Sequence, residues 1–155
     1  MLTVLIPSFN HEEYILDCLR SAADINLEGM KILVVDDGST DGTVNVVERF
    51  VADNKNIDVK LVKKENAGLV DSLNIGLSLI KTDYIIICAS DDYLLSLGVR
   101  KCLDSISKDK KYKFAIGNAI ILSEKGIKVD VERFRELMKE QKKRSRDARK
   151  NAGAD

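Results

Sequence analysis

The chain has 155 residues, 45% of them apolar and 32% charged, and a net charge of zero, values typical of one soluble globular domain with a sizeable core. These values exclude global disorder, and the most apolar stretch, 84–89, is far shorter than the ~20 residues that span a bilayer. Three widely spaced cysteines, Cys18, Cys88 and Cys102, predict reduced core thiols and a cytoplasmic location, and one histidine without paired cysteines excludes an ordinary structural zinc site.

The first part of the chain alternates between predicted strands and helices. A β-branched run at 3–6 predicts a strand that ends at Pro7, and Asn10 and Glu13 have the spacing of a capping box that starts a helix. An apolar strand follows at 31–35 and leads into a polar turn rich in helix-capping residues. The apolar faces expected for the two helices are Ile15, Leu19 and Ala22, and then Val44, Val47 and Val51.

The same order of strand, turn and helix continues to about residue 92. Alternating apolar residues at 57–61 predict a half-buried strand, and the strand at 84–88 is the most apolar, so we expect it to be central. Such repeats predict an α/β fold with a mostly parallel sheet and flanking helices. The apolar face expected for the third helix is Leu69, Leu73, Leu77 and Ile80.

The composition changes toward the end of the chain. A strand is expected at 114–122, a hairpin turn at 123–126, and a helix with an apolar face at 131–138. Residues 132–150 hold nine Lys/Arg against four Asp/Glu. We therefore expect a domain at 1–128 and a basic helical or disordered tail at 129–155. The tail is either a solvated charged helix or a contact with an anionic membrane; we expect no nucleic-acid partner, and an open sheet edge would allow self-association.

Three predicted strand ends carry unusual polar groups, at 8–10, 36–39 and 90–92. In open α/β sheets, ligands bind where the carboxyl ends of the strands meet. Two acidic pairs, Asp36–Asp37 and Asp91–Asp92, would repel each other at one edge unless a cation lay between them. Carboxylate oxygens suit Mg²⁺ or Mn²⁺, which bridge a protein to a diphosphate. The residues thus predict a divalent-metal and phosphate-ester site, with turn and helix-capping chemistry as the alternative for each pair.

Two other side chains lie in the first of these loops. Phe9, among polar residues, is either a core plug or a stacking platform. His11 is predicted to be a surface residue, neither a ligand nor a base. Neither residue identifies a ligand by itself.

The sequence resembles the family 2 glycosyltransferases, which have the GT-A nucleotide-sugar-binding fold. The resemblance covers roughly residues 2–122 and consists of four motifs in series. One motif alone would be unspecific, whereas the shared order and spacing of four is highly specific. The matching stretches are VLIPSFN at 4–10, ILVVDDGSTDGT at 32–43, ENAGL at 65–69 with LNIGL at 73–77, and 83–92, which ends in SDD.

The resemblance implies a base pocket near the first two motifs. Pro7 and Phe9 would line this pocket, with Phe9 in the place of a stacking aromatic. Asp37 would accept a hydrogen bond from a uracil N–H, and Asp36 would support the turn that holds Asp37. Uridine diphosphate is therefore the favoured nucleotide.

The later motifs imply the sugar and metal contacts. Asn66 and Gly68 would lie in the loop that closes over the nucleotide sugar. Asp91 and Asp92 stand at the acidic metal motif, where one residue contacts ribose or sugar and the other the metal. We favour Asp92 as the ligand of Mn²⁺ or Mg²⁺.

Some positions depart from the family pattern. Ala89 stands where many members have a carboxylate, and Leu73 where many have Arg. Family members also continue for roughly a hundred further residues, which supply the general base and most of the acceptor site. Three glutamates of the tail are not placed in the site by anything in the sequence, so the catalytic base is unknown.

The resemblance predicts an inverting glycosyltransferase that moves a sugar from a UDP-linked donor to a glycan or lipid-linked acceptor with a divalent metal, as in polysaccharide biosynthesis. The alternative is a non-catalytic nucleotide-sugar-binding fragment without the base and the acceptor site. A phosphoacceptor receiver domain is disfavoured because its late Lys-Pro pair is missing. A dinucleotide-binding domain is disfavoured because no G-x-G-x-x-G follows a strand.

Overall fold

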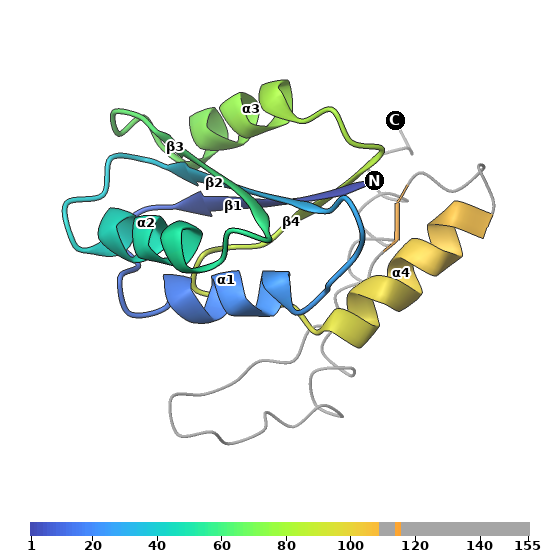
Figure 1. Ribbon diagram of the computed structural model, residues 1–155. Helices are drawn as coiled ribbons and strands as arrows, with labels where there is room; N and C mark the ends of the chain where they lie inside the picture. The colour runs from blue at the N-terminus through green and yellow to red at the C-terminus, as the bar shows by residue number, and fades with distance from the viewer. Residues whose placement is uncertain (109–113, 116–155) are drawn as a thin grey trace, which may run out of the picture. The chain divides into compact units, whose positions relative to one another are not determined.

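Strands and helices alternate strictly along the chain in the computed structural model, which describes residues 1–108 and 114–115 (Figure 1). Within this part, Met1–Ala115 forms one compact unit. The expected boundary at 128/129, the turn at 123–126 and the basic tail lie outside the described residues, as does all but the start of the strand expected at 114–122. The elements are β1 (Leu2–Ser8), α1 (Ile15–Ala23), β2 (Lys31–Asp36), α2 (Thr43–Asp53), β3 (Asp58–Lys63), α3 (Leu69–Leu79), β4 (Tyr84–Ile87) and α4 (Ser96–Lys108).

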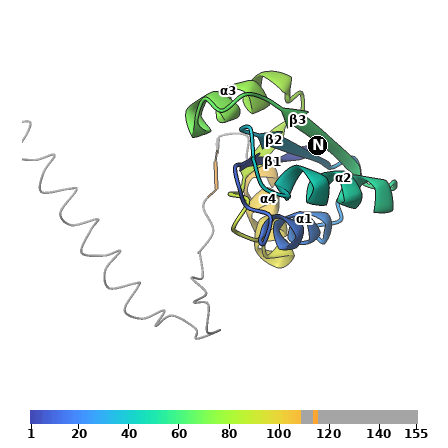
Figure 2. The ribbon, with the colours of Figure 1, turned by 90° about the vertical axis from the view of Figure 1, so that its left-hand side faces the viewer.

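The four strands form one sheet in the order β3-β2-β1-β4, and every neighbouring pair is parallel. Helices α1, α2 and α4 pack on one face, and α3 packs on the other (Figures 1 and 2). The predicted parallel α/β architecture is therefore confirmed. Because the strands are parallel, the loops that follow β1, β2 and β4 all leave from the same edge of the sheet.

Strand β1 continues through Pro7 to Ser8, so the prediction that Pro7 ends the strand was wrong. The backbone of Leu5 faces β4, since Leu5 O accepts from Cys88 N at 3.0 Å. Residues two apart in a strand direct their backbone N and O atoms to the same side, so the backbone N of Pro7 also faces β4. The ladder between β1 and β4 ends at the pair Leu5 and Ile87, so no partner requires the N–H that proline lacks.

Strand β4 is not central within the described residues, because it pairs only with β1. Its side chains alternate between half-buried and exposed, and Ile87 is 55% exposed. The interior strands are β1 and β2, whose residues are almost all buried. Apolar content therefore predicted the strand correctly, and the central place expected for it is not seen among the described residues.

Helix α3 turns to the sheet a face that was predicted only in part: Leu73 and Ile80 pack against the core as expected. Its buried residues are Ser72 and Gly76, whereas Leu69 and Leu77 are exposed. A Cβ on Gly76 would lie 2.4 Å from Leu5 Cδ1. The glycine lets the helix backbone approach β1 closely, so the small residues define the contact face.

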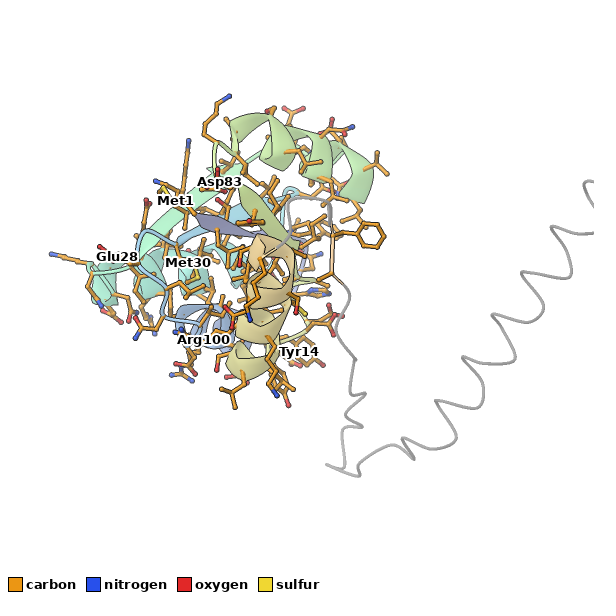
Figure 3. The ribbon with its side chains drawn as sticks, turned by 90° about the vertical axis from the view of Figure 1, so that its right-hand side faces the viewer. Met1, Tyr14, Glu28, Met30, Asp83 and Arg100 are labelled. Atoms are coloured by element: carbon orange, nitrogen blue, oxygen red, sulfur yellow. The ribbon has the colours of Figure 1, made fainter. Side chains whose placement is uncertain are left out.

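The segment after β4 is tied to α1 and to the loop behind it. Leu94 N donates to Ser21 Oγ at 2.9 Å, and the Arg100 guanidinium of α4 donates to the carbonyls of Ile25 and Asn26 (Figure 3). These bonds fix where the chain leaves the carboxyl edge of β4. No helix in the described ranges has the length and apolar character needed to cross a membrane.

The cysteines are free thiols, as predicted. Cys18 and Cys88 are buried with their sulfur atoms 3.9 Å apart, and Cys102 is half-buried. The contact with Cys88 and burial raise the pKa of the Cys18 thiol. This thiol therefore stays protonated and acts as a small apolar side chain of the core.

Candidate functional site

Three loops meet at the carboxyl edge of the sheet and are joined by hydrogen bonds. Asp37 N, after β2, donates to Ser8 O of β1 at 2.8 Å. Asn10, after β1, accepts from Thr40 N at 2.8 Å, and its own N–H donates to Ser39 Oγ at 2.9 Å. The side chain of Asn10 thus connects two loops and does not cap α1.

The predicted capping box of Asn10 and Glu13 was therefore wrong. Asn10 has a left-handed backbone with φ 53°, and α1 begins only at Ile15. Asparagine is one of the few residues that tolerates this conformation. The left-handed residue turns the chain, so that its side chain faces the neighbouring loop.

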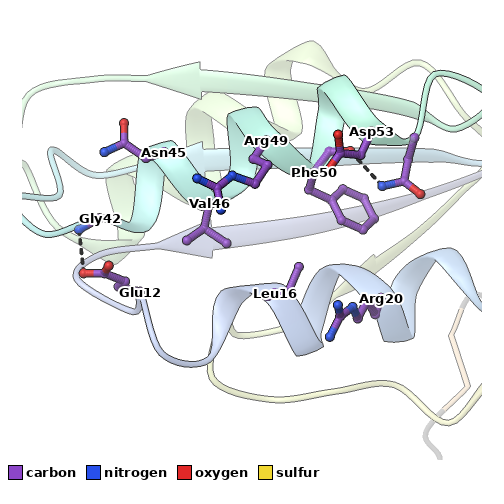
Figure 4. A pocket seen from close by; sticks show the side chains of 10 residues that line it. Glu12, Leu16, Arg20, Gly42, Asn45, Val46, Arg49, Phe50 and Asp53 are labelled. Atoms are coloured by element: carbon purple, nitrogen blue, oxygen red, sulfur yellow. Dashed lines mark hydrogen bonds between the residues drawn. The ribbon is translucent and has the colours of Figure 1, made fainter.

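A second connection involves Glu12, which the sequence analysis did not single out. Its carboxylate accepts from Gly42 N at 2.8 Å (Figure 4), and its own N–H donates to Asp41 Oδ2 at 3.1 Å. Asp41 also accepts from Thr43 N at 2.9 Å and Thr43 Oγ1 at 2.5 Å. Burial would raise the pKa of Asp41, but these hydrogen bonds outweigh it and hold the pKa below its usual range.

His11 was expected to be a surface residue, yet it links all three loops. Its N–H donates to Thr43 Oγ1 at 2.8 Å, and its ring Nδ1 lies 2.7 Å from Ser90 Oγ. Ser90 is buried and directly precedes Asp91 and Asp92. The histidine therefore positions the backbone that carries the acidic pair. A lone histidine in a loop gives no sequence signal for this role.

Asp36 and Asp37 have different tasks, although they are adjacent and both buried. Asp36 accepts from Ser39 N at 2.9 Å and from Ser39 Oγ at 2.5 Å, so it shapes the turn after β2. Asp37 points instead to the loop after β3, where it accepts from Ala67 N at 2.9 Å and Gly68 N at 2.8 Å. The turn-supporting role of Asp36 in nucleotide binding stays a prediction, which these bonds from Ser39 permit.

Lys64 completes the surroundings of Asp37. Its ammonium contacts Asp37 Oδ1, Glu65 O at 2.8 Å and Asp71 Oδ2 at 3.0 Å. The side chains of Lys64 and Asp37 are 10% and 7% exposed. The hydrogen bond from Lys64, followed by that from Ala67 N, holds the pKa of Asp37 below its usual range, so this carboxyl group is ionised.

The remaining predicted site residues, except Pro7, are accessible. Phe9 is 42% exposed, which excludes the core-plug interpretation and leaves its ring free to stack. Asn66, Asp91 and Asp92 are also exposed. In the part of the chain that the structure describes, neither Asp91 nor Asp92 has a side-chain hydrogen bond or ion pair. Pro7 is buried in β1 beneath this edge.

The geometry is compatible with the predicted metal, but the described residues do not surround a metal position with protein ligands alone. Among residues 1–108 and 114–115, no three His, Cys, Asp or Glu side chains come together to hold a metal. Two exposed carboxylates suit Mg²⁺ or Mn²⁺, which take their other ligands from water and phosphate. The structure also leaves Ser8 Oγ buried at this edge without a partner among the described residues.

A separate groove of about 680 Å³ lies between α1 and α2 (Figure 4). It is lined by Arg20 and Arg49 together with Leu16, Val46 and Phe50. None of the predicted site residues lines this groove, and it lies on the face of the sheet that α1, α2 and α4 cover. The candidate site is therefore the carboxyl edge and not this groove.

Comparisons with known proteins bear on this geometry. The family model described as Glycosyl transferase family 2 matches residues 3–153. Chondroitin synthase from Pasteurella multocida (strain Pm70) is 33% identical over 110 residues, which is 71% of this chain and 11% of that protein. The chain therefore spans about a tenth of the length of this relative.

Two solved structures are similar in fold. A fragment of TarS from S. aureus in complex with UDP has a TM-score of 0.62 and 26% identity, covering 69% of this chain and 32% of that one. The mannosyltransferase PcManGT from Pyrobaculum calidifontis, in complex with GDP-Man and Mn²⁺, has a TM-score of 0.55 and 28% identity, covering 58% and 27%. The likeness identifies the fold as GT-A.

Proposed function

Because this chain belongs to glycosyl transferase family 2, we propose that it binds the donor of a glycosyl transfer at the carboxyl edge of its sheet. The donor is a nucleoside diphosphate sugar, with UDP as the favoured nucleotide and Mn²⁺ or Mg²⁺ as the metal. The acceptor is a glycan or a lipid-linked sugar, and the transfer inverts the anomeric centre. The UDP and the GDP-Man with Mn²⁺ in the two similar structures support the class of ligand.

One observation carries the proposal: hydrogen bonds join three loops at the edge where the matching residues lie. The bond between Asp37 N and Ser8 O joins the first two loops, and the contact between His11 and Ser90 joins the third. Phe9 is free to stack on a base, and Asp37 is an ionised acceptor for its N–H. Asp91 and Asp92 remain available for the ribose and the metal.

The chemistry follows from these charges. A bound Mg²⁺ or Mn²⁺ would neutralise the leaving diphosphate, and Asp92 is the residue we propose to hold it. Asp91 would orient the ribose or sugar, and Asn66 and Gly68 would close over the donor. An acceptor hydroxyl would then attack the anomeric carbon, with a general base that we assign to no described residue.

The test is a thermal-shift titration of the full chain with UDP, other nucleoside diphosphates and phosphate alone, each with and without Mn²⁺. A ligand at 100 times its Kd adds about 2.7 kcal/mol to the unfolding free energy, which such a measurement resolves easily. We expect stabilisation by UDP that requires Mn²⁺. In Asp92→Ala, most of the stabilisation by UDP should be lost, and adding Mn²⁺ should no longer increase it. The control Asp53→Ala changes an exposed residue of α2 and should leave the stabilisation by UDP and its dependence on Mn²⁺ unchanged.

A folded chain that responds to no nucleotide would refute the proposal. The second candidate, a nucleotide-sugar-binding module without transfer activity, is separated by turnover. Release of UDP from UDP-sugars, with and without oligosaccharide acceptors, supports a transferase. Binding without release supports the binding module.

A further inference from the structure

Lys64 is a nearly buried cation that the family motifs do not include. It comes directly after β3, and its ammonium has three acceptors: carboxylate oxygens of Asp37 and Asp71 and the carbonyl of Glu65. An ammonium group has three donors and no acceptor. All three are therefore used, and Lys64 has no donor left for a ligand.

The acceptor positions of Asp37 can be counted in the same way. An ionised carboxylate offers about four lone-pair positions. Oδ1 accepts from Lys64 Nζ and Ala67 N, and Oδ2 accepts from Gly68 N. One position, on Oδ2, is left among the contacts of the described residues.

We propose that Lys64 is a positioning residue for base recognition: it keeps Asp37 ionised and aimed, so that the free Oδ2 position accepts only an N–H donor. This inference rests on the proposed nucleotide-binding function. It assigns the specificity of the pocket to the pair of Asp37 and Lys64, and not to the carboxylate alone. The ligands selected are nucleotides whose base carries an imide-type N–H.

The chemistry of the bases gives this proposal its content. Uracil presents N3–H between two carbonyls, so it can donate to Oδ2. Cytosine has an unprotonated N3, whose lone pair would face the carboxylate without a proton between them. A polar site of this kind rejects the ligand that leaves its buried group unpaired, by factors of up to about 10⁴. A protonated Asp37 could instead donate to cytosine N3, and the discrimination would be lost.

The groups around Asp37 explain why Lys64 has this effect. From the end of β3, Lys64 is the cation that faces Asp37, and Asp71 of α3 lies behind it. Asp36 turns its carboxylate to Ser39. Removing Lys64 would leave the carboxylate of Asp37 with two backbone donors and no cation, and it would remove the positive charge between Asp37 and Asp71. Both changes raise the pKa of Asp37 above its wild-type value, while the bonds from Ala67 N and Gly68 N continue to lower it. The lowered pKa of Asp37, with Lys64 as its first cause, agrees with this argument.

The experiment compares Lys64→Met with the matched control Lys63→Met. Lys63 is the preceding residue, but its side chain is 54% exposed and pairs with Glu48. The full chain is titrated with UDP and with CDP in Mn²⁺ between pH 5 and pH 8. The ratio of wild-type to variant affinity is followed, since titration of the nucleotide phosphates cancels in it.

We expect Lys64→Met to lose UDP affinity, and to lose more of it at pH 5 than at pH 8, because the raised pKa of Asp37 weakens its charge-assisted hydrogen bond to the base. The preference for UDP over CDP should shrink in parallel. Lys64→Arg should restore both, and Lys63→Met should behave as wild type.

Two results would overturn the inference while the proposed function stands. One is Lys64→Met with wild-type affinities at every pH. The other is an equal, pH-independent loss of UDP and CDP, which indicates a merely structural lysine. If wild type binds no nucleotide, the proposed function itself fails, and the inference with it. If Lys64→Met does not fold, the Asp37 carboxyl is titrated by NMR in the unaltered chain, and a pKa at or above the usual ~3.9 contradicts the proposal.

Discussion

The hydroxyl of Thr43 is the contact through which the carboxyl-edge loops are held, and Thr43→Val tests this directly. Thr43 is 0% exposed. Its Oγ1 accepts from His11 N at 2.8 Å and donates to Asp41 Oδ1 at 2.5 Å. Valine has the same shape without the hydroxyl, so the substitution creates no cavity. Any effect then reports the two hydrogen bonds.

The magnitude follows from what each partner loses. The bond to Asp41 is charge-assisted and is worth about 1.5–3 kcal/mol, and an unpaired, partly buried N–H at His11 costs about 1–3 kcal/mol. Asp41 keeps its bonds from Thr43 N and Glu12 N, which reduces the sum. We therefore expect a loss of about 2–3 kcal/mol in the unfolding free energy, and a Tm lower by about 4–12 °C.

The assay is urea unfolding of the full chain followed by circular dichroism, with Thr40→Val as the control. Thr40 lies in the same loop, but it is exposed, and its hydroxyl is 3.4 Å from Asn10 Oδ1. The control should stay within about 0.5 kcal/mol of wild type. A second readout is Mn²⁺-dependent UDP binding, which should weaken because His11 also holds Ser90. If Thr43→Val and Thr40→Val are equally stable, the network does not organise this edge.

Two further predictions concern the same edge. Gly38→Ala should lower the unfolding free energy by about 1–2 kcal/mol or more, since Gly38 has φ 74° and a Cβ there would lie 2.9 Å from Asn66 N. The control is Gly98→Ala, where a Cβ would have no atom closer than 3.9 Å, and it should not destabilise the chain in the same urea unfolding assay. Equal stability of the two variants would contradict the argument. The lowered pKa values of Asp37 and Asp41 predict a contribution to stability that is fully present above the unfolded pKa near 3.8 and is lost as the pH falls through the folded values. Between pH 7 and pH 2, the unfolding free energy measured with urea should therefore fall less for Asp37→Asn than for wild type. Identical pH profiles would show that Asp37 contributes nothing.

The sequence predicted the elements well where burial alone decides them. The run at 31–35 has an apolar residue at nearly every position, and β2 is buried on both faces. The face of α1 was also predicted, because Ile15 and Leu19 are buried as expected. In α2, Val47 is buried as expected, whereas the buried Phe50 was not predicted. In such elements a residue's polarity and its environment agree, so periodicity is sufficient.

The errors occurred where a specific approach of two backbones overrides polarity. In α3 the buried positions are Ser72 and Gly76 because the helix lies directly on Leu5. The predicted apolar stripe found Leu73 and Ile80, which pack against the core, but a search for apolar residues cannot find positions that are selected for small volume. For β4 the apolar residues suggested a central strand, whereas among the described residues it pairs only with β1. Composition does not report which strands pair.

The candidate site shows the same limit in a sharper form. The motif identified Asp37 as an acceptor, and residue type alone establishes that much. How many of its lone pairs remain for a ligand depends on Lys64, Ala67 and Gly68, which lie on a different loop and are brought there by the pairing of β2 with β3. A carboxylate with four open positions would accept from many ligands, whereas one with a single open position beside a fixed cation discriminates. The selectivity that we propose for this edge is therefore a property of the fold, and this is why a lysine outside every motif is the residue whose removal should change which base is bound.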